Sequence, residues 1–145
     1  MEIGDLCSRE VYLVRRDDPL GDAVREMHRH HVGAVVVVEP RGALLSPVGI
    51  VTDRDVLRGQ IACRSDLFSL KIQDVMTPDP LTLSERCGLA EGLSQMKARS
   101  VRRAPVVSDL GNLVGIVSFD DLLPAVSEEL AVLAKLIGRQ AAQEP

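Results

Sequence analysis

Aromatic side chains are scarce in this sequence. The chain of 145 residues has no tryptophan, one tyrosine and two phenylalanines, although 46% of its residues are hydrophobic. Its core must therefore be aliphatic, and the chain has few of the aromatic rings on which single-stranded nucleic acids stack. A formal charge of −4 also argues against non-specific binding to nucleic acid. We expect one compact folded unit that binds no nucleic acid.

Cysteines and long apolar runs are also rare. Cys7, Cys63 and Cys87 are odd in number and contain no C-x-x-C pair, so neither a disulfide framework nor a zinc site is predicted. The longest apolar run in the middle of the chain, Ala34 to Val38, is too short to span a bilayer. The N-terminal residues have neither a basic start nor an apolar stretch. We therefore expect a cytoplasmic protein without a membrane partner.

Metal binding and catalysis have only weak signals. His28 and His31 share a helical face, as two metal ligands would, but no cysteine or carboxylate supplies an obvious third ligand. Exposed polar residues at a helix end are the simpler interpretation, so we predict no metal site. Neither Ser84 nor Ser118 lies in a nucleophile-elbow pattern, and the chain has no glycine-rich phosphate loop. We expect no catalytic residue and no enzymatic activity.

An internal repeat is the main feature of the sequence. Val48 to Leu57 reads VGIVTDRDVL, and Val114 to Leu123 reads VGIVSFDDLL. In each copy a short apolar run ends at a hydroxyl residue, Thr52 or Ser118, and an aspartate follows three residues later. This pattern predicts a strand that runs directly into a helix, and it occurs twice.

The repeat extends over nearly the whole chain. An offset of 69 residues (72 − 3) relates Ile3 to Ile72 and persists for more than thirty residues, after which it falls to 66 (114 − 48) at a longer turn in the first copy. The periodicity of each copy predicts a strand, a helix, two strands and a second helix. The last helix is expected from Phe119 to about Ile137. A helix tolerates Pro124 only in its first turn or at a kink.

The hydroxyl and the aspartate at each junction have two interpretations. Thr52 with Asp55, and Ser118 with Asp121, are what helix capping requires, because the hydroxyl accepts the third amide and the acid suits the helix dipole. The same groups, beside backbone amides without a helical partner, are also suited to binding a small polar molecule. For a single copy we favour capping, whereas two copies within a longer repeat favour a binding site.

These residues resemble the paired cystathionine β-synthase (CBS) domain module, also called a Bateman module. The similarity rests on five segments: Val32 to Val38, Gly49 to Asp55, Asp74 to Pro78, Arg103 to Val107, and Gly115 to Asp121. It covers about residues 3 to 123. It implies an α+β fold in which two β-α-β-β-α CBS repeats pack with pseudo-twofold symmetry, followed by a C-terminal helix. We expect repeat 1 at 3–62, a linker at 63–71, repeat 2 at 72–124, and the helix and tail at 125–145.

The resemblance also implies two clefts that bind adenosine-containing ligands. These are of the AMP, ATP or S-adenosylmethionine class, and they act as regulatory ligands, so no cofactor is obligatory. In similar modules each cleft combines the acid of one repeat with the strand entry of the other. The first cleft is then expected to contain Thr52, Asp55, Arg102, Arg103 and Pro105. The second is expected to contain Ser118, Asp121, Gly33 and Ala34, with Arg54 within reach.

The chemistry of these residues suggests different roles for acids and bases. A carboxylate accepts hydrogen bonds from both ribose hydroxyls, each contributing about 1.5 to 3 kcal/mol. Acidic helix starts disfavour phosphate, so we expect Asp55 and Asp121 to hold sugar. The guanidiniums of Arg102 and Arg103 are suited to phosphate, and the equally weighted alternative is that both are solvated or paired with nearby acids. Gly33 and Ala34 stand where the second repeat has Arg102 and Arg103, so the clefts should differ, with the first preferring phosphorylated ligands.

Two classes of function remain. The first is a regulatory module that senses a ligand and signals to an unidentified partner protein by a conformational change, and the second is a structural dimerisation module with empty clefts. The repeat favours the first. The last helix carries Leu130, Leu133, Leu136 and Ile137 on one side with little else to cover them, so we also expect a homodimer.

Overall fold

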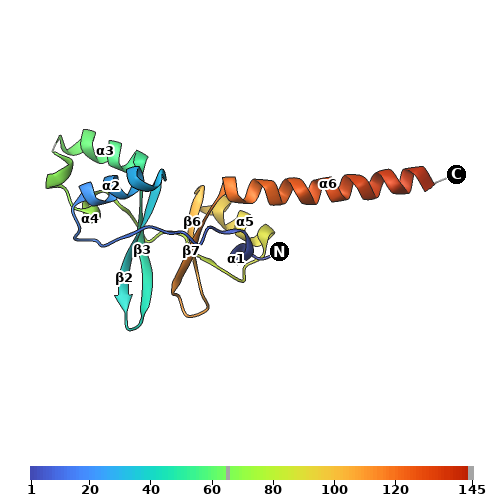
Figure 1. Ribbon diagram of the computed structural model, residues 1–145, viewed down its shortest axis with the longest axis horizontal. Coiled ribbons are helices and arrows are strands. Elements are labelled where there is room, and N and C mark those ends of the chain that lie inside the picture. The colour runs from blue at the N-terminus through green and yellow to red at the C-terminus, as the bar shows by residue number, and fades with distance from the viewer. Residues whose placement is uncertain (65, 144–145) are drawn as a thin grey trace.

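The helices and strands follow the repeat of the sequence (Figure 1). The computed structural model describes residues 1–64 and 66–143. The first part contains α1 (Ile3–Leu6), β1 (Leu13–Val14), α2 (Leu20–His30), β2 (Ala34–Arg41), β3 (Leu44–Thr52) and α3 (Asp53–Cys63). A connection follows with η1 (Leu67–Ser69), α4 (Ile72–Val75) and β4 (Thr77–Pro78). The second part contains β5 (Leu83–Ser84), α5 (Leu89–Arg99), β6 (Arg103–Val107), β7 (Leu113–Ser118) and α6 (Phe119–Gln143).

Each repeat has its own small sheet, with the same pairing in both. The strand orders are β1-β2-β3-β4 and β5-β6-β7. β1 is parallel to β2, which is antiparallel to β3, and β5, β6 and β7 repeat this arrangement. Ala34 pairs with Thr52 in the first sheet, and Arg103 pairs with Ser118 in the second. The register therefore sets the entry of one strand beside the hydroxyl that ends the next, in the same way in both repeats of this α+β fold.

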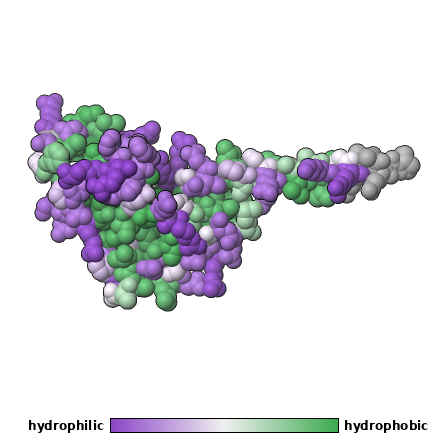
Figure 2. Space-filling view, viewed as in Figure 1, coloured by the Kyte–Doolittle hydropathy of each residue, from purple (hydrophilic) through white to green (hydrophobic). Residues whose placement is uncertain are grey.

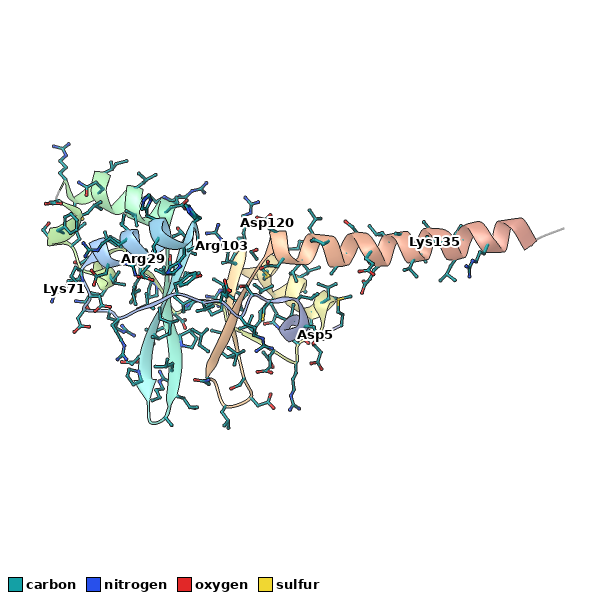
Figure 3. The ribbon with its side chains drawn as sticks, in the orientation of Figure 1. Asp5, Arg29, Lys71, Arg103, Asp120 and Lys135 are labelled. Carbon is teal, nitrogen blue, oxygen red and sulfur yellow. The ribbon has the colours of Figure 1, made fainter. Side chains whose placement is uncertain are left out.

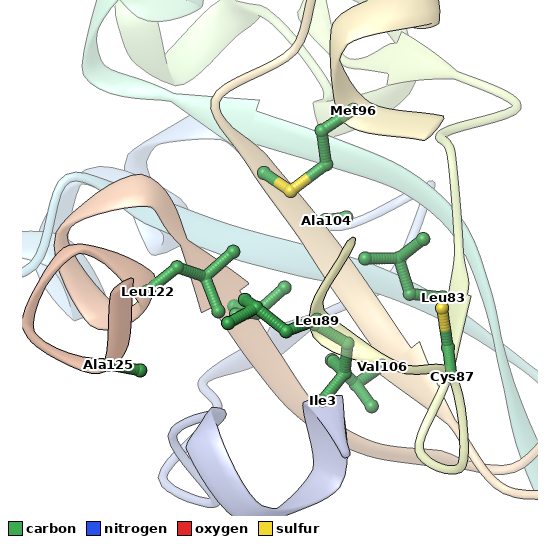
Figure 4. Packing of buried hydrophobic residues seen from close by; sticks show 10 residues of the cluster. Ile3, Leu83, Cys87, Leu89, Met96, Ala104, Val106, Leu122 and Ala125 are labelled. Atoms are coloured by element: carbon green, nitrogen blue, oxygen red, sulfur yellow. The ribbon is translucent and has the colours of Figure 1, made fainter. Parts of the chain in front are cut away.

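Both cores are aliphatic, as the shortage of aromatic residues predicts. On α2 the buried residues Leu20, Ala23 and Met27 recur at helical spacing and pack under the first sheet. The run Val35 to Val38 is buried throughout, so both faces of β2 are covered. In the second core, Leu89 and the other packed side chains are drawn in Figure 4.

The segment ahead of each repeat packs on the other repeat. Ile3 of α1 is fully buried in the second core, among residues of β5, α5 and β6 (Figure 4). Its backbone N–H donates to the carbonyl of Cys87 at 2.7 Å. Ile72 of α4 is fully buried in the first core, and its N–H donates to the carbonyl of Asp18 at 2.9 Å. Each core therefore contains one short helix that belongs, in the order of the sequence, to the other repeat: α1 in the second core and α4 in the first.

The last helix is longer than predicted. α6 begins at Phe119, as expected, but it continues to Gln143 and passes through Pro124 in its second turn. The proline removes the N–H that would bond the carbonyl of Asp120, and because Asp120 is exposed, water can take that place. Among the residues described, no helix has the combination of length and apolar character that crossing a membrane requires.

Candidate functional site

Thr52 and Asp55 form a complete capping box at the start of α3. The hydroxyl oxygen of Thr52 accepts the N–H of Asp55 at 3.2 Å, and Oδ2 of Asp55 accepts the N–H of Thr52 at 2.9 Å. Both residues are partly buried. The capping interpretation is therefore confirmed for the first copy.

The second junction repeats this geometry. The N–H of Asp121 donates to Ser118 Oγ at 3.3 Å, and the N–H of Ser118 donates to Asp121 Oδ2 at 2.9 Å. The Ser118 hydroxyl also lies 3.1 Å from that Oδ2. Within residues 1–64 and 66–143, Oδ1 of Asp55 and Oδ1 of Asp121 have no hydrogen-bond partner. Capping thus holds each carboxylate in place and leaves one oxygen for a ligand.

The backbone amides at the start of α3 are not available, contrary to the prediction. The N–H of Asp53 donates to the carbonyl of Gly33 at 3.1 Å, and the N–H of Arg54 donates to Asp53 Oδ1 at 2.8 Å. The third amide, of Asp55, is bound by Thr52. The sequence pattern could not reveal the hydrogen bond between Asp53 and Gly33, because Gly33 is distant in the sequence, just before β2. Any ligand at this junction must be held by side chains.

A cleft of about 390 Å³ lies beside the first junction. Of the predicted residues it is lined by Thr52, Asp55, Arg102 and Arg103. Pro105 does not line it, because this residue is buried in β6, where it pairs with Ile116. Arg54, which we expected near the second cleft, lines the first one because α3 begins there.

Further residues of this cleft were not predicted. Its lining also includes Ile50, Asp53, Thr77, Val101, Ser118, Phe119 and Asp120. Asp53 and Asp120 occupy the first turns of α3 and α6. Together with Asp55 they give the lining three acids, which equal its three arginines in formal charge. Thr77 comes from β4, which pairs with β3. The repeat places the junction residues, but the sequence gives no signal for the strand that crosses beside them.

A second cleft of about 210 Å³ lies beside the other junction. It is lined by the four residues predicted for it, Gly33, Ala34, Ser118 and Asp121. Arg103 also lines it, so the basic residue of this cleft is Arg103 and not the expected Arg54. Glu10 and Tyr12, from the segment ahead of β1, complete a wall that the repeat pattern did not predict.

Arg103 lies between the two repeats, and Figure 3 shows it near Asp120 at the start of α6. Its Nη1 donates to the carbonyl of Gly33 at 3.2 Å, and both clefts include it in their lining. Arg102 is exposed, and neither arginine forms an ion pair with any described residue. Pairing of these arginines with acids is therefore not seen in the described part of the chain, whereas the exposed Arg102 fits the alternative of a solvated side chain.

His30, Cys7 and Cys87 have contacts or burial that fit a structural role. The ring of His30 stacks on Tyr12, with centroids 3.7 Å apart, and its Nε2 lies 3.3 Å from a carboxylate oxygen of Glu26. No group of three metal-ligating side chains occurs within the described ranges. Burial raises the pKa of the Cys7 and Cys87 thiols, which keeps both protonated at neutral pH.

The fold defines a module of two tandem repeats with one cleft beside each strand–helix junction. The chain belongs to the CBS domain family, whose sequence model matches residues 3–61 and 72–128. It is 36% identical over 115 residues to a mitochondrial CBS domain-containing protein of Arabidopsis thaliana, which covers 78% of this chain and 55% of that protein.

Two further similarities extend the comparison. The chain is 33% identical over 115 residues to the inosine-5'-monophosphate dehydrogenase of Methanocaldococcus jannaschii, covering 79% of this chain and 21% of the enzyme. The CBS domain pair of protein MJ0100, solved in complex with 5'-methylthioadenosine and S-adenosyl-L-methionine, matches with a TM-score of 0.75 at 21% identity. That match covers 89% of this chain and 98% of the solved chain. The chain spans 55% of the Arabidopsis protein and 21% of the archaeal enzyme, so the activity of neither whole protein is assigned to it.

Proposed function

We propose that this chain is a regulatory module that binds adenosine-containing ligands in the clefts between its repeats and signals by a conformational change. The first cleft carries this proposal, because a hydroxyl, a capped carboxylate and three guanidiniums line one cavity of about 390 Å³. That volume lies within the range of small-molecule sites, about 300 to 1,000 Å³. The related MJ0100 pair, bound to two adenosyl ligands, supports this ligand class.

The carboxylates are suited to the ribose. Asp55 is partly buried and held by its cap, so it presents Oδ1 with little loss of side-chain entropy. A diol can donate both hydrogens to a carboxylate, whereas a phosphate beside Asp53 and Asp55 meets two negative charges at the helix start. In the second cleft, Asp121 has the equivalent role.

The arginines are suited to a phosphate. Arg102 and Arg54 are exposed and lie on opposite repeats, and the guanidinium of Arg103 lies between the repeats. A phosphorylated ligand that contacts all three connects the two repeats. Because binding then depends on how the repeats are placed, the ligand favours one arrangement over others, which provides a signal for a partner protein.

The alternative function, a structural module with empty clefts, has one observation in its favour. The capping box accounts for Thr52 and Asp55 without any ligand. It does not account for the grouping of three arginines, Arg54, Arg102 and Arg103, around one cleft. Two sets of variants separate the alternatives.

Asp55→Asn should weaken binding of AMP or S-adenosylmethionine by roughly tenfold while the fold stays intact. The amide oxygen can still cap the N–H of Thr52, but the charge that strengthens the bonds to ribose is lost, at about 1.5 kcal/mol. Isothermal titration calorimetry measures the affinity. Asp17→Asn, an exposed acid outside both clefts, is the control. Equal affinities for Asp55→Asn and the unchanged protein would remove Asp55 from the site.

Replacing Arg102 and Arg103 together by alanine should reduce the preference for AMP over adenosine by ten- to a hundredfold. Each guanidinium–phosphate contact contributes about 1 kcal/mol or slightly more after screening, so the effect should shrink as salt is added. The matched control replaces Arg15 and Arg16, an adjacent exposed pair away from the clefts. An unchanged preference in the Arg102/Arg103 variant would show that phosphate lies elsewhere, and Arg54 would be tested next.

A further inference from the structure

The two clefts share part of one wall. Arg103 and Ser118 line both of them, and these two residues pair with each other across β6 and β7. Hydrophilic residues are prominent where the two repeats meet on the face drawn in Figure 2. The first turn of α6 is divided between the clefts, since Asp120 lines the first and Asp121 lines the second. A change in one cleft therefore reaches groups that also form the other.

The guanidinium of Arg103 lies against the backbone of Gly33. Its Nη1 donates to the carbonyl of Gly33 at 3.2 Å, and a Cβ on Gly33 would lie 3.3 Å from Nη2. The same carbonyl accepts the N–H of Asp53, at the start of α3, at 3.1 Å. Glycine at this position allows the close approach of the guanidinium. One side chain of the second repeat thus contacts the strand entry of the first repeat and lines both clefts.

Arg103 has a different weight in the two clefts. In the first cleft it is one of three arginines, together with Arg54 and Arg102. Among the described residues that line the second cleft, it is the one with a basic side chain, and the same lining contains the acids Glu10 and Asp121. If the charge of Arg103 is neutralised, the remaining charges of the second cleft are negative. A phosphate is then repelled from this cleft.

We propose that Arg103 couples the two clefts, so that a phosphorylated ligand in the first cleft weakens the binding of another in the second. A bidentate contact uses two parallel N–H groups of the guanidinium for one phosphate, and a single positive charge neutralises only one of two neighbouring phosphates. Adenosine has no phosphate, so its binding to one cleft should leave the other unchanged. The coupling rests on the proposed function, because it needs nucleotide binding in both clefts.

The expected coupling is about five- to tenfold in affinity, at the lower end of the range that is typical of coupled sites. Arg103 is partly buried, so water and salt screen its interactions less than those of a fully exposed charge. The effect is reciprocal, because binding in either cleft changes the affinity of the other by the same factor. The chain should therefore bind one AMP tightly and a second AMP weakly.

Two-dimensional NMR of the full chain measures the occupancy of each cleft separately. Thr77 lines only the first cleft and Tyr12 only the second, so their backbone amide signals report on one cleft each. The test variant is Arg54→Ala, Arg102→Ala, because both residues line only the first cleft. In this variant AMP should occupy the second cleft at about five- to tenfold lower concentration than in the unchanged protein. Arg58→Ala, an exposed arginine of α3 that lines neither cleft, is the control and should change nothing.

The direction of this change is diagnostic. The loss of two positive charges would by itself weaken AMP binding, so a gain in the second cleft requires coupling. Adenosine affinities of the second cleft should agree between the unchanged protein and the test variant. In an Arg103→Ala background, removal of Arg54 and Arg102 should change the AMP affinity of the second cleft by less than about twofold, because the shared side chain is gone.

Three results would contradict the coupling, and they differ in what they say of the proposed function. Equal AMP affinities of the second cleft in the unchanged protein and the test variant would overturn the coupling, while adenosine shifts at Thr77 and Tyr12 would still support ligand sensing. A gain that persists in the Arg103→Ala background would show that Arg103 does not carry the coupling. If neither amide signal moved with AMP or adenosine at millimolar concentration, both the coupling and the proposed function would be wrong.

Discussion

Ile3→Ala is expected to lower the free energy of unfolding by about 2 to 5 kcal/mol, although Ile3 lies near the end of the chain. Its side chain is fully buried in the second core, and the replacement leaves a cavity there. Chemical denaturation monitored by circular dichroism measures the loss. Leu57→Ala is the control, because Leu57 is 65% exposed and should change stability little.

The location of the damage tests the exchange of helices between the repeats. Hydrogen exchange of Ile3→Ala should show faster exchange first in β6 and β7, in the second repeat, and not in β2 and β3. Ile72→Ala should show the opposite pattern, because Ile72 fills the first core. A loss of protection in the first repeat of the Ile3 variant would contradict the packing described here.

Gly115→Ala is expected to destabilise the protein by roughly 2 to 4 kcal/mol, from overpacking and from weakened backbone hydrogen bonds. A Cβ on Gly115 would lie 2.6 Å from the carbonyl oxygen of Ser8. That backbone cannot move freely, because Ser8 and Ile116 exchange two backbone hydrogen bonds at 2.9 and 3.0 Å. The free energy of unfolding from urea titration measures the effect.

Gly49→Ala is the matched control, because Gly49 is the equivalent residue of the first repeat. A Cβ there would lie 2.7 Å from the sulfur of Met76, a flexible side chain, and 3.2 Å from the carbonyl oxygen of Thr77. The methionine can move, so the expected loss is about 1 kcal/mol. Equal losses for Gly115→Ala and Gly49→Ala would show that the fixed backbone at Ser8 is not the cause.

The repeat in the sequence predicted the fold because its period is visible in the residues themselves. The two strand–helix junctions, at Thr52 and Ser118, needed only local hydrophobic patterns and capping signals. The packing of α1 and α4 on opposite repeats could not be predicted in this way. The apolar character of Ile3 and Ile72 indicates that they are buried, but it does not indicate which core they enter. The choice is made by tertiary contacts between distant segments.

Strand and helix ends were less predictable for the same reason. A full strand was expected at the start of each copy, but β1 and β5 contain two paired residues each. Pairing needs a neighbouring strand along the whole segment, which hydrophobicity alone does not report.

For the candidate site, the sequence predicted where the junction residues lie, whereas their role in binding stays a prediction. Both clefts contain the junction residues and strand entries assigned to them, since these follow the repeat. Pro105 and Arg54 were misplaced, because their environment depends on the direction of a side chain on a strand or on a helix turn. Arg103 between the clefts was missed, since the sequence does not show that its side chain reaches Gly33.

Thermal unfolding of the dialysed protein with AMP, ADP, ATP, NADH and S-adenosylmethionine tests the central claim most directly. At a concentration a hundredfold above its dissociation constant, a ligand that binds the folded clefts should stabilise the protein by about 2.7 kcal/mol. We expect at least one adenosyl ligand to raise the unfolding temperature by several degrees, and this rise to be reduced in the Asp55→Asn, Asp121→Asn double variant. Unchanged unfolding temperatures with every ligand at millimolar concentration would contradict ligand sensing and favour the structural module.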